Sequence, residues 1–119
     1  MMADVLIVDD DARVRETLSD IIEDRGYTVA CAGDGQAALD LLRREPNDPC
    51  VIVLDLVMPV MSGTELLSIM RADTRLGQIP VVTVSALSDP GIHADHVRHL
   101  KKPVHPRVLL SAVSDLCTC

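Results

Sequence analysis

The sequence predicts an α/β domain in which a parallel β-sheet is covered by helices on both faces. Short apolar runs alternate along the chain with segments in which apolar residues recur at helical spacing. The runs are almost continuously apolar, which is typical of strands that are buried on both sides. The 119 residues, of which 48% are hydrophobic, suit one domain with an aliphatic core, because the chain has one Tyr and no Phe or Trp.

The first elements are a strand, a helix and a second strand. Residues 4–8 form an apolar run that predicts the first strand. Apolar residues then recur at helical spacing from Val14 to Ile22, and Gly26 is placed to end this helix. Residues 28–31 are a short β-branched segment, which predicts the second strand.

The middle of the chain continues this alternation. The residues from Ala37 to Leu42 provide a second apolar helical face, and residues 50–54 are a continuous apolar run that predicts the third strand. Ser62 and Glu65 then form an S-x-x-E capping box, which predicts the start of the next helix.

The last part of the chain contains two strand candidates and a final helix. Residues 80–84 are a β-branched run, whereas residues 98–101 have a weaker strand pattern. Pro106 suits the first turn of the final helix. Between the two strands, Pro90 and Gly91 interrupt a segment without an apolar repeat, so we expect a helix there to be short, irregular or missing.

Three acidic residues follow strands that should end at the same edge of the sheet. Asp9 and Asp10 follow the first strand, and Asp55 follows the third. Like charges in contact repel by about 1 kcal/mol per pair even in water, so a fold that gathers them is expected to use them. Carboxylate oxygens are the ligands of hard dications such as Mg²⁺ or Mn²⁺. Ser85 and Lys102 also follow strand candidates and should reach the same edge.

These residues suit the chemistry of phosphoryl transfer. A carboxylate held beside a dication can attack phosphorus and form an aspartyl phosphate. The transfer needs mainly positioning and neutralisation of charge, which the dication and the Lys102 ammonium would supply. The Ser85 hydroxyl can donate a hydrogen bond to a phosphoryl oxygen.

Four motifs occur in a fixed order along the chain. VDDD ends the first apolar run, D-x-x-M-P-x-M-x-G extends from Asp55 to Gly63, VTVSA contains Ser85, and the last motif is Lys102–Pro103. This series covers nearly the whole chain and resembles the receiver domain of bacterial two-component response regulators. The resemblance implies a flavodoxin-like, doubly wound sheet of five parallel strands in the order 2-1-3-4-5. It also implies one receiver domain, the response-regulatory domain, over residues 1–119.

The resemblance implies which residues accept the phosphoryl group and bind the metal. Asp55 would be the phosphoacceptor. Mg²⁺ would be bound by Asp10 directly, by Asp9 mostly through water, by Asp55 and by the backbone carbonyl of Val57. Lys102 would pair with the phosphoryl oxygens.

The resemblance also implies a switch near the end of the fourth strand. Ser85 would follow the phosphoryl group, and the Lys102–Pro103 peptide bond would be cis, an isomer that is accessible mainly before proline. Receivers usually carry Tyr or Phe three residues before the lysine, where this chain has His99. His99 is therefore a second switch candidate, with a smaller and more polar ring than Tyr or Phe.

Val57 and Leu87 are candidates for setting the rate of dephosphorylation. They lie two residues after Asp55 and Ser85, at positions that border the path of the attacking water in the family. Two aliphatic side chains should hinder that water. We therefore expect slow self-dephosphorylation.

The implied partners are those of a phosphorelay. The phosphodonor would be a phosphohistidine on a sensor histidine kinase or a phosphotransfer protein, and phosphorylation would switch contact with an output domain or protein. The fourth helix belongs to the usual output and homodimer face, so we expect that face to be altered. A stand-alone regulator and a receiver from a longer protein both fit the sequence.

Charge and hydropathy exclude several classes of partner. The net charge of −7 argues against direct binding to nucleic acid and to anionic membranes. No apolar stretch approaches the length of a membrane span, and a strand begins too early for a signal peptide. We therefore expect a cytoplasmic protein.

The cysteines favour packing over disulfide or metal chemistry. Cys31 and Cys50 lie in apolar strand contexts and are expected to be small, buried side chains. A zinc site formed by the C-terminal cysteines with His93 and His96 would lack the paired ligand spacing of structural zinc sites.

The leading interpretation is a signalling module that takes part in its own phosphorylation and dephosphorylation without being a turnover enzyme. A degenerate receiver that binds partners independently of phosphorylation is the main alternative. A phosphatase of the haloacid dehalogenase type would need an acid where Val57 stands. A flavin-binding domain would need a Gly-rich phosphate loop and an aromatic side chain to stack on the flavin.

Overall fold

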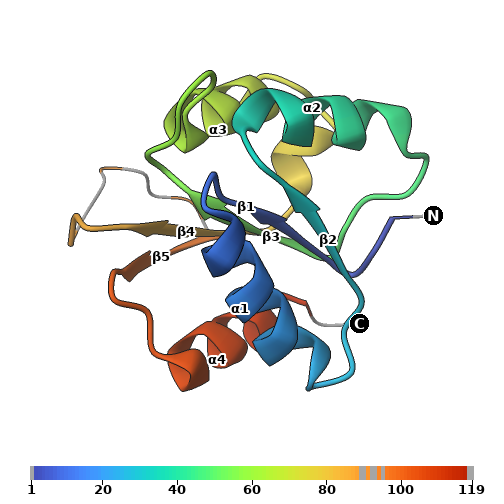
Figure 1. Ribbon diagram of the computed structural model, residues 1–119. Coiled ribbons are helices and arrows are strands. Elements are labelled where there is room, and N and C mark those ends of the chain that lie inside the picture. Colours follow the sequence, from blue (N-terminus) through green and yellow to red (C-terminus); the bar gives the residue numbers. More distant parts are fainter. Residues whose placement is uncertain (1, 89–90, 92–93, 95, 118–119) are drawn as a thin grey trace.

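The computed structural model describes residues 2–88, 91, 94 and 96–117. Strands and helices alternate along the chain (Figure 1). The strands are β1 (Val5–Val8), β2 (Val29–Ala32), β3 (Val51–Asp55), β4 (Val81–Ser85) and β5 (Val97–Lys101). The helices are α1 (Ala12–Glu23), α2 (Gly35–Arg44), α3 (Gly63–Arg71), the short 3₁₀ helix η1 (Leu76–Gln78) and α4 (Pro106–Leu116). No helix within these described residues is long and apolar enough to cross a membrane.

The strands form one parallel sheet in the order β2-β1-β3-β4-β5, which confirms the predicted doubly wound topology. The register pairs Val8 with Leu54 and Asp55 with Val84. Neighbouring strands therefore end at nearly the same level. The residues that follow β1, β3, β4 and β5 meet at one edge of the sheet, around the point where the strand order reverses.

Two aliphatic cores hold the helices against the sheet. Helices α2 and α3 cover one face, and α1 and α4 cover the other (Figure 1). Successive strand residues face opposite sides, so Leu6 belongs to the first core and Ile7 to the second. Both side chains are fully buried, as the continuous apolar runs predicted.

Side-chain caps fix the starts of the helices near the edge where the strands end. The Asp11 carboxylate accepts a hydrogen bond from the Arg13 N–H at 2.9 Å and caps α1. Ser62 Oγ accepts from the Glu65 N–H at 3.1 Å, which confirms the predicted capping box of α3. Pro106 occupies the first turn of α4, also as predicted.

The connection between β4 and β5 differs from the other crossovers. Its described residues, 86–88, 91, 94 and 96, contain no helix, in agreement with the prediction for this segment. Ala94 instead forms an isolated antiparallel bridge with Val97. Pro90, which contributed to the prediction, lies outside the described residues.

The predictions for two cysteines were wrong. Cys31 is exposed, because β2 is an edge strand of the sheet. Cys50 forms a disulfide with Cys117, and their Cα atoms lie 5.1 Å apart. The pair is 67 residues apart in sequence, so no local pattern indicated it. The zinc alternative involves His93, which lies outside the described residues.

Candidate functional site

The acidic cluster lies at the sheet edge where β1 and β3 end. Asp9 follows β1, and Asp55 is the last residue of β3. One carboxylate oxygen from each of Asp9, Asp10 and Asp55 lies within 4.8 Å of the others. Asp9 and Asp55 are buried, with relative exposures of 6% and 5%, whereas Asp10 is exposed. The fold therefore gathers two buried negative charges and one exposed negative charge.

The environment of Asp9 disfavours its charged form. Burial is the main cause that raises the pKa of Asp9, and the charges of Asp55 and Asp10 act in the same direction. The Asp11 N–H, which donates to Asp9 Oδ1 at 2.9 Å, opposes the shift, as does the charge of Lys102. A bound cation would supply the stabilisation that this carboxylate lacks.

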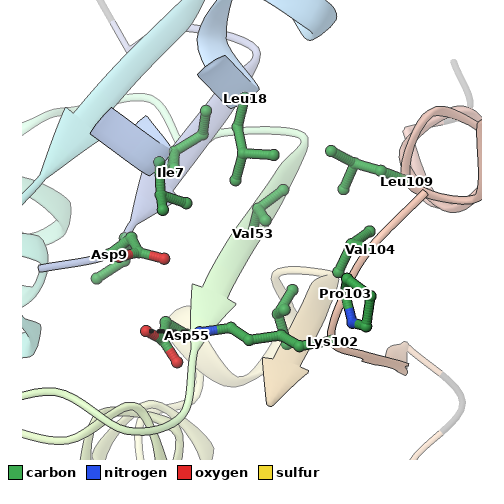
Figure 2. Close-up of a pocket in the computed structure, with 12 residues that line it drawn as sticks. Ile7, Asp9, Leu18, Val53, Asp55, Lys102, Pro103, Val104 and Leu109 are labelled. Carbon is green, nitrogen blue, oxygen red and sulfur yellow. Dashed lines mark hydrogen bonds and ion pairs between the residues drawn. The ribbon is translucent and has the colours of Figure 1, made fainter. Parts of the chain in front are cut away.

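Asp55 is held by one backbone bond and one ion pair. Its Oδ1 accepts a hydrogen bond from the Val57 N–H at 3.1 Å. The Lys102 ammonium lies 3.4 Å from Asp55 Oδ2, and Figure 2 shows the lysine side chain reaching across from the end of β5. The carboxylate is buried while the lysine side chain remains 43% exposed, so solvent reaches the ion pair from one side.

Glycine at the start of α3 allows that helix to lie directly against Asp55. The Gly63 N–H donates to the Leu56 carbonyl at 3.1 Å. A Cβ at Gly63 would lie 2.1 Å from the Asp55 carbonyl oxygen and 2.7 Å from Leu56 Cα. No side chain fits there, so this close approach fixes the backbone beneath the Asp55 carboxylate.

Lys102 is anchored next to the end of β4. Its backbone N–H donates to the Ser85 carbonyl at 2.8 Å. The Lys102–Pro103 peptide bond is cis, the isomer that the resemblance implied. Lys101 is paired with Ser85 in the register, and its side chain is exposed. Lys102 and not its neighbour therefore reaches the acidic cluster.

His99 joins the end of β4 to β5 through its ring. The ring Nε2 lies 2.6 Å from the Leu87 carbonyl, and Nδ1 lies 2.9 Å from Thr83 Oγ1. A ring that carries its proton on Nε2 donates to Leu87 and accepts from Thr83. Ser85 Oγ lies 3.4 Å from the same Nε2. The two predicted switch residues are thus in contact.

Thr83 is a participant that the sequence analysis missed. Its side chain is fully buried and is a hydrogen-bond partner of His99. A signal was present, because Thr83 is a polar residue two positions before Ser85 in an otherwise apolar run and shares its face of the strand.

The same local turn follows three of the strands. Asp9 accepts a hydrogen bond from the N–H two residues later, at Asp11, and Asp55 accepts one from Val57. Ser85 Oγ accepts from the Leu87 N–H at 3.2 Å. Each of these functional side chains is therefore oriented by its own following backbone.

The loops that follow β3 and β4 expose large apolar side chains. Val57 is 75% exposed and Leu87 is 60% exposed. Both follow functional residues by two positions, as the sequence showed, and both project away from the core. Val60, in the same loop as Val57, is 82% exposed and has φ of 68°, which is uncommon for a β-branched residue.

The donor set fits a hard dication. Asp9, Asp10 and Asp55 offer carboxylate oxygens at mutual distances that one ion can span, without the sulfur or imidazole ligands that softer metals prefer. The cluster can therefore hold a metal such as Mg²⁺.

Comparison with known proteins identifies the family. The family model for the response regulator receiver domain matches residues 5–114. The chain belongs to the response regulator receiver family. It is therefore a signalling module and not a turnover enzyme.

Individual relatives agree with this assignment. The DNA-binding response regulator MtrA of Mycolicibacterium paratuberculosis is 32% identical over 114 residues, which are 92% of this chain and 48% of that protein. This receiver thus spans about half the length of the curated relatives that it matches first.

Solved receiver structures have the same fold. The receiver domain of a signal transduction histidine kinase from Syntrophus aciditrophicus has a TM-score of 0.86 and 31% identity, and the match covers 98% of this chain and 90% of that one. The chemotaxis protein CheY4 of Vibrio cholerae has a TM-score of 0.83 and 30% identity, with 98% and 99% covered.

Proposed function

We propose that Asp55 accepts a phosphoryl group from a phosphohistidine in a reaction that requires a dication. The arrangement that supports this is one buried carboxylate with two acidic neighbours within 4.8 Å and a lysine ammonium at 3.4 Å. The donor would be a sensor histidine kinase or a phosphotransfer protein. The cytoplasm, where such donors present their phosphohistidine, is the proposed location.

Mg²⁺ or Mn²⁺ would be held by Asp9, Asp10, Asp55 and the backbone carbonyl of Val57. When bound, the ion would neutralise the clustered carboxylates and the phosphoryl oxygens, so that two negatively charged partners can approach. Metal binding also favours ionised Asp9, whose pKa is raised by burial.

In the transfer, an oxygen of the Asp55 carboxylate forms a bond to phosphorus while the phosphorus–nitrogen bond of the donor histidine breaks. The electron pair of that bond returns to the imidazole, and Asp55 becomes an acyl phosphate. Lys102 stabilises the phosphoryl oxygens, because its ammonium already lies beside Asp55. The Val57 N–H holds the other carboxylate oxygen and keeps the nucleophile oriented.

The new phosphoryl group would attract the Ser85 hydroxyl. In the structure, Ser85 Oγ accepts a hydrogen bond from the Leu87 N–H and lies near His99. Movement of the hydroxyl would disturb both contacts. The loss of the contact between His99 and Leu87 would then carry the signal to the segment between β4 and β5. That segment, or an altered homodimer face near it, would contact the output partner.

The decisive experiment is the intact mass of the protein after incubation with acetyl phosphate, with Mg²⁺ or with EDTA. We expect a gain of one phosphoryl group with Mg²⁺ only. Asp55→Ala should gain nothing, whereas the control Asp20→Ala, which changes an exposed carboxylate on α1, should react like the wild type.

A folded wild type that gains no mass with Mg²⁺ would contradict the proposal. That outcome would favour the alternative of a phosphorylation-independent interaction domain. Equal modification of the Asp55→Ala variant would show that another residue is the acceptor.

A further inference from the structure

An apolar cavity of about 450 Å³ lies directly behind the acidic cluster. Its floor is the sheet, with Ile7 and Val53, and its walls include Leu18 of α1 and Leu109 of α4 (Figure 2). Val104, between β5 and α4, forms part of the rim. This volume lies within the range of about 300–1,000 Å³ that is typical of small-molecule sites.

The composition of the chain explains why this space remains open. The core contains no Phe or Trp, and the walls are Val, Leu and Ile side chains. Val14, Leu18 and Val104 are only half-buried, so they do not close the rim. Aliphatic walls offer water no hydrogen bonds, and apolar cavities of this kind take up apolar molecules instead.

The end of the cavity that adjoins the acidic cluster is lined by charged side chains. Asp9, Asp55 and Lys102 line it, and Figure 2 shows all three at the same end. The two carboxylates are buried, and the single lysine ammonium pairs with Asp55 at 3.4 Å. Two carboxyl groups therefore face one ammonium, and the Asp10 carboxyl group lies nearby.

We propose that this cavity binds a small primary amine with a compact apolar body. The ammonium would lie against Asp9, and the body would fill the space between the sheet, α1 and α4. An alcohol of the same shape would leave the buried charge uncompensated, and a carboxylate would add a third negative charge. An ammonium supplies both the charge and the hydrogen-bond donors.

Such an amine would be an antagonist of the phosphorylation site. Its ammonium group would bind the Asp9 carboxylate, which is also a ligand in the proposed dication site. The amine and the dication would therefore exclude each other. This part of the inference rests on the proposed function. The binding itself does not, because it can be measured without any phosphoryl donor.

The first test is titration of the metal-free protein with phenethylamine. Binding is measured from amide chemical shifts and from the thermal unfolding temperature. We expect saturable shifts in residues of β1, β3 and α1, and a higher melting temperature. Phenethyl alcohol and hydrocinnamate, which have similar apolar bodies, should bind at least about tenfold more weakly, because the alcohol carries no positive charge and the acid adds a negative one. Added Mg²⁺ should weaken amine binding.

Three variants with the same substitution separate the cavity from the rest of the surface. Val104→Phe and Val14→Phe each put a larger side chain at the half-buried rim and should abolish amine binding. Val108→Phe, at a position that is 50% exposed and does not line the cavity, should leave binding unchanged. All three should still react with acetyl phosphate.

Several outcomes would overturn the inference. Equal affinity for the amine, the alcohol and the acid would show that the acidic end does not select the ligand. Unchanged affinity in both rim variants would exclude the cavity, and saturation unaffected by Mg²⁺ would exclude the antagonism between the amine and the dication. If amine binding follows the expected pattern but acetyl phosphate does not react, the cavity proposal holds and the proposed function fails.

Discussion

The two halves of the functional edge of the sheet are built in different ways. At the ends of β1 and β3, buried carboxylates accept hydrogen bonds from the backbone that follows them, and α3 packs against Asp55 without an intervening side chain. At the ends of β4 and β5, Ser85 accepts the same kind of backbone bond, but the further contacts converge on the His99 ring, beside a connection that has no helix in its described residues. In the proposed function, phosphoryl chemistry depends on the first half and signal output on the second.

The strongest test of this contrast is Gly63→Ala. The added Cβ would lie 2.1 Å from the Asp55 carbonyl oxygen, so the backbone of the site must shift. We expect a loss of about 3 kcal/mol in the free energy of unfolding, at the upper end of typical overpacking effects, as measured by urea titration. Gly33→Ala is the control, because its Cβ would make only an ordinary contact at 3.5 Å with Arg15. Equal losses in the two variants would contradict a tightly packed site.

The rim of the site should control how long the phosphoryl group persists. Val57→Asn combined with Leu87→Glu replaces two exposed aliphatic side chains with polar ones that can hold the attacking water. We expect phosphoryl loss to become about tenfold faster, which corresponds to about 1.4 kcal/mol in the barrier. The decay is followed by intact mass after removal of acetyl phosphate.

Val60→Asn is the control for the rim prediction, because it changes an exposed valine elsewhere in the same loop. Unchanged or slower decay in the double variant would rule out this role of the rim.

The β4–β5 half should respond to His99→Phe with a local effect. The substitution keeps an aromatic ring but removes the hydrogen bonds to Thr83 and Leu87, each with a net contribution of about 1 kcal/mol. Amide hydrogen exchange should become faster at Leu87 and remain unchanged in β1. His96→Phe, just before β5, is the control. A comparable acceleration in β1 would show that the two halves are not independent.

The smallest expected effect is the dependence of stability on pH through Asp9. Because the folded state raises the pKa of Asp9, it holds this proton more tightly than the unfolded state does. In metal-free buffer, Asp9 should therefore contribute less to the free energy of unfolding as pH rises from about 4 through the raised pKa. Asp9→Asn should remove this decline and increase the stability near neutral pH, as measured by urea titration at several pH values.

Asp73 provides a control of opposite sign. Hydrogen bonds from the Leu76 and Arg75 N–H groups lower its pKa, so its stabilising contribution is present at neutral pH and is lost as pH falls. Asp73→Asn should reduce stability near neutral pH. The same sign for both variants would contradict the assigned environments.

Sequence patterns predicted the parts of the molecule that depend on local rules. The strands that lead to Asp9 and Asp55 and the Ser62 capping box follow from periodicity and from unpaired backbone groups. Helix-breaking residues also indicated the irregular connection before β5, although part of that segment lies outside the described residues.

The features that the sequence did not reveal depend on contacts between distant segments. Exposure of Cys31 follows from the position of β2 at the sheet edge, and the Cys50 disulfide needs a partner at the other end of the chain. The bond between Thr83 and His99 and the cavity behind Asp9 likewise require two strands or several elements to be in place. Apart from the polar Thr83 within an apolar run, such contacts have no signature in a single stretch of residues.

The repeated turn after β1, β3 and β4 has a consequence for how this site can evolve. Asp9, Asp55 and Ser85 are each oriented by the amide of the second residue that follows, at Asp11, Val57 and Leu87. An amide is common to every residue except proline, so the side chains at those three positions can vary without redirecting the functional groups. Under the proposed function, the lifetime of the signal would therefore be adjustable at Val57 and Leu87 independently of the chemistry that creates it.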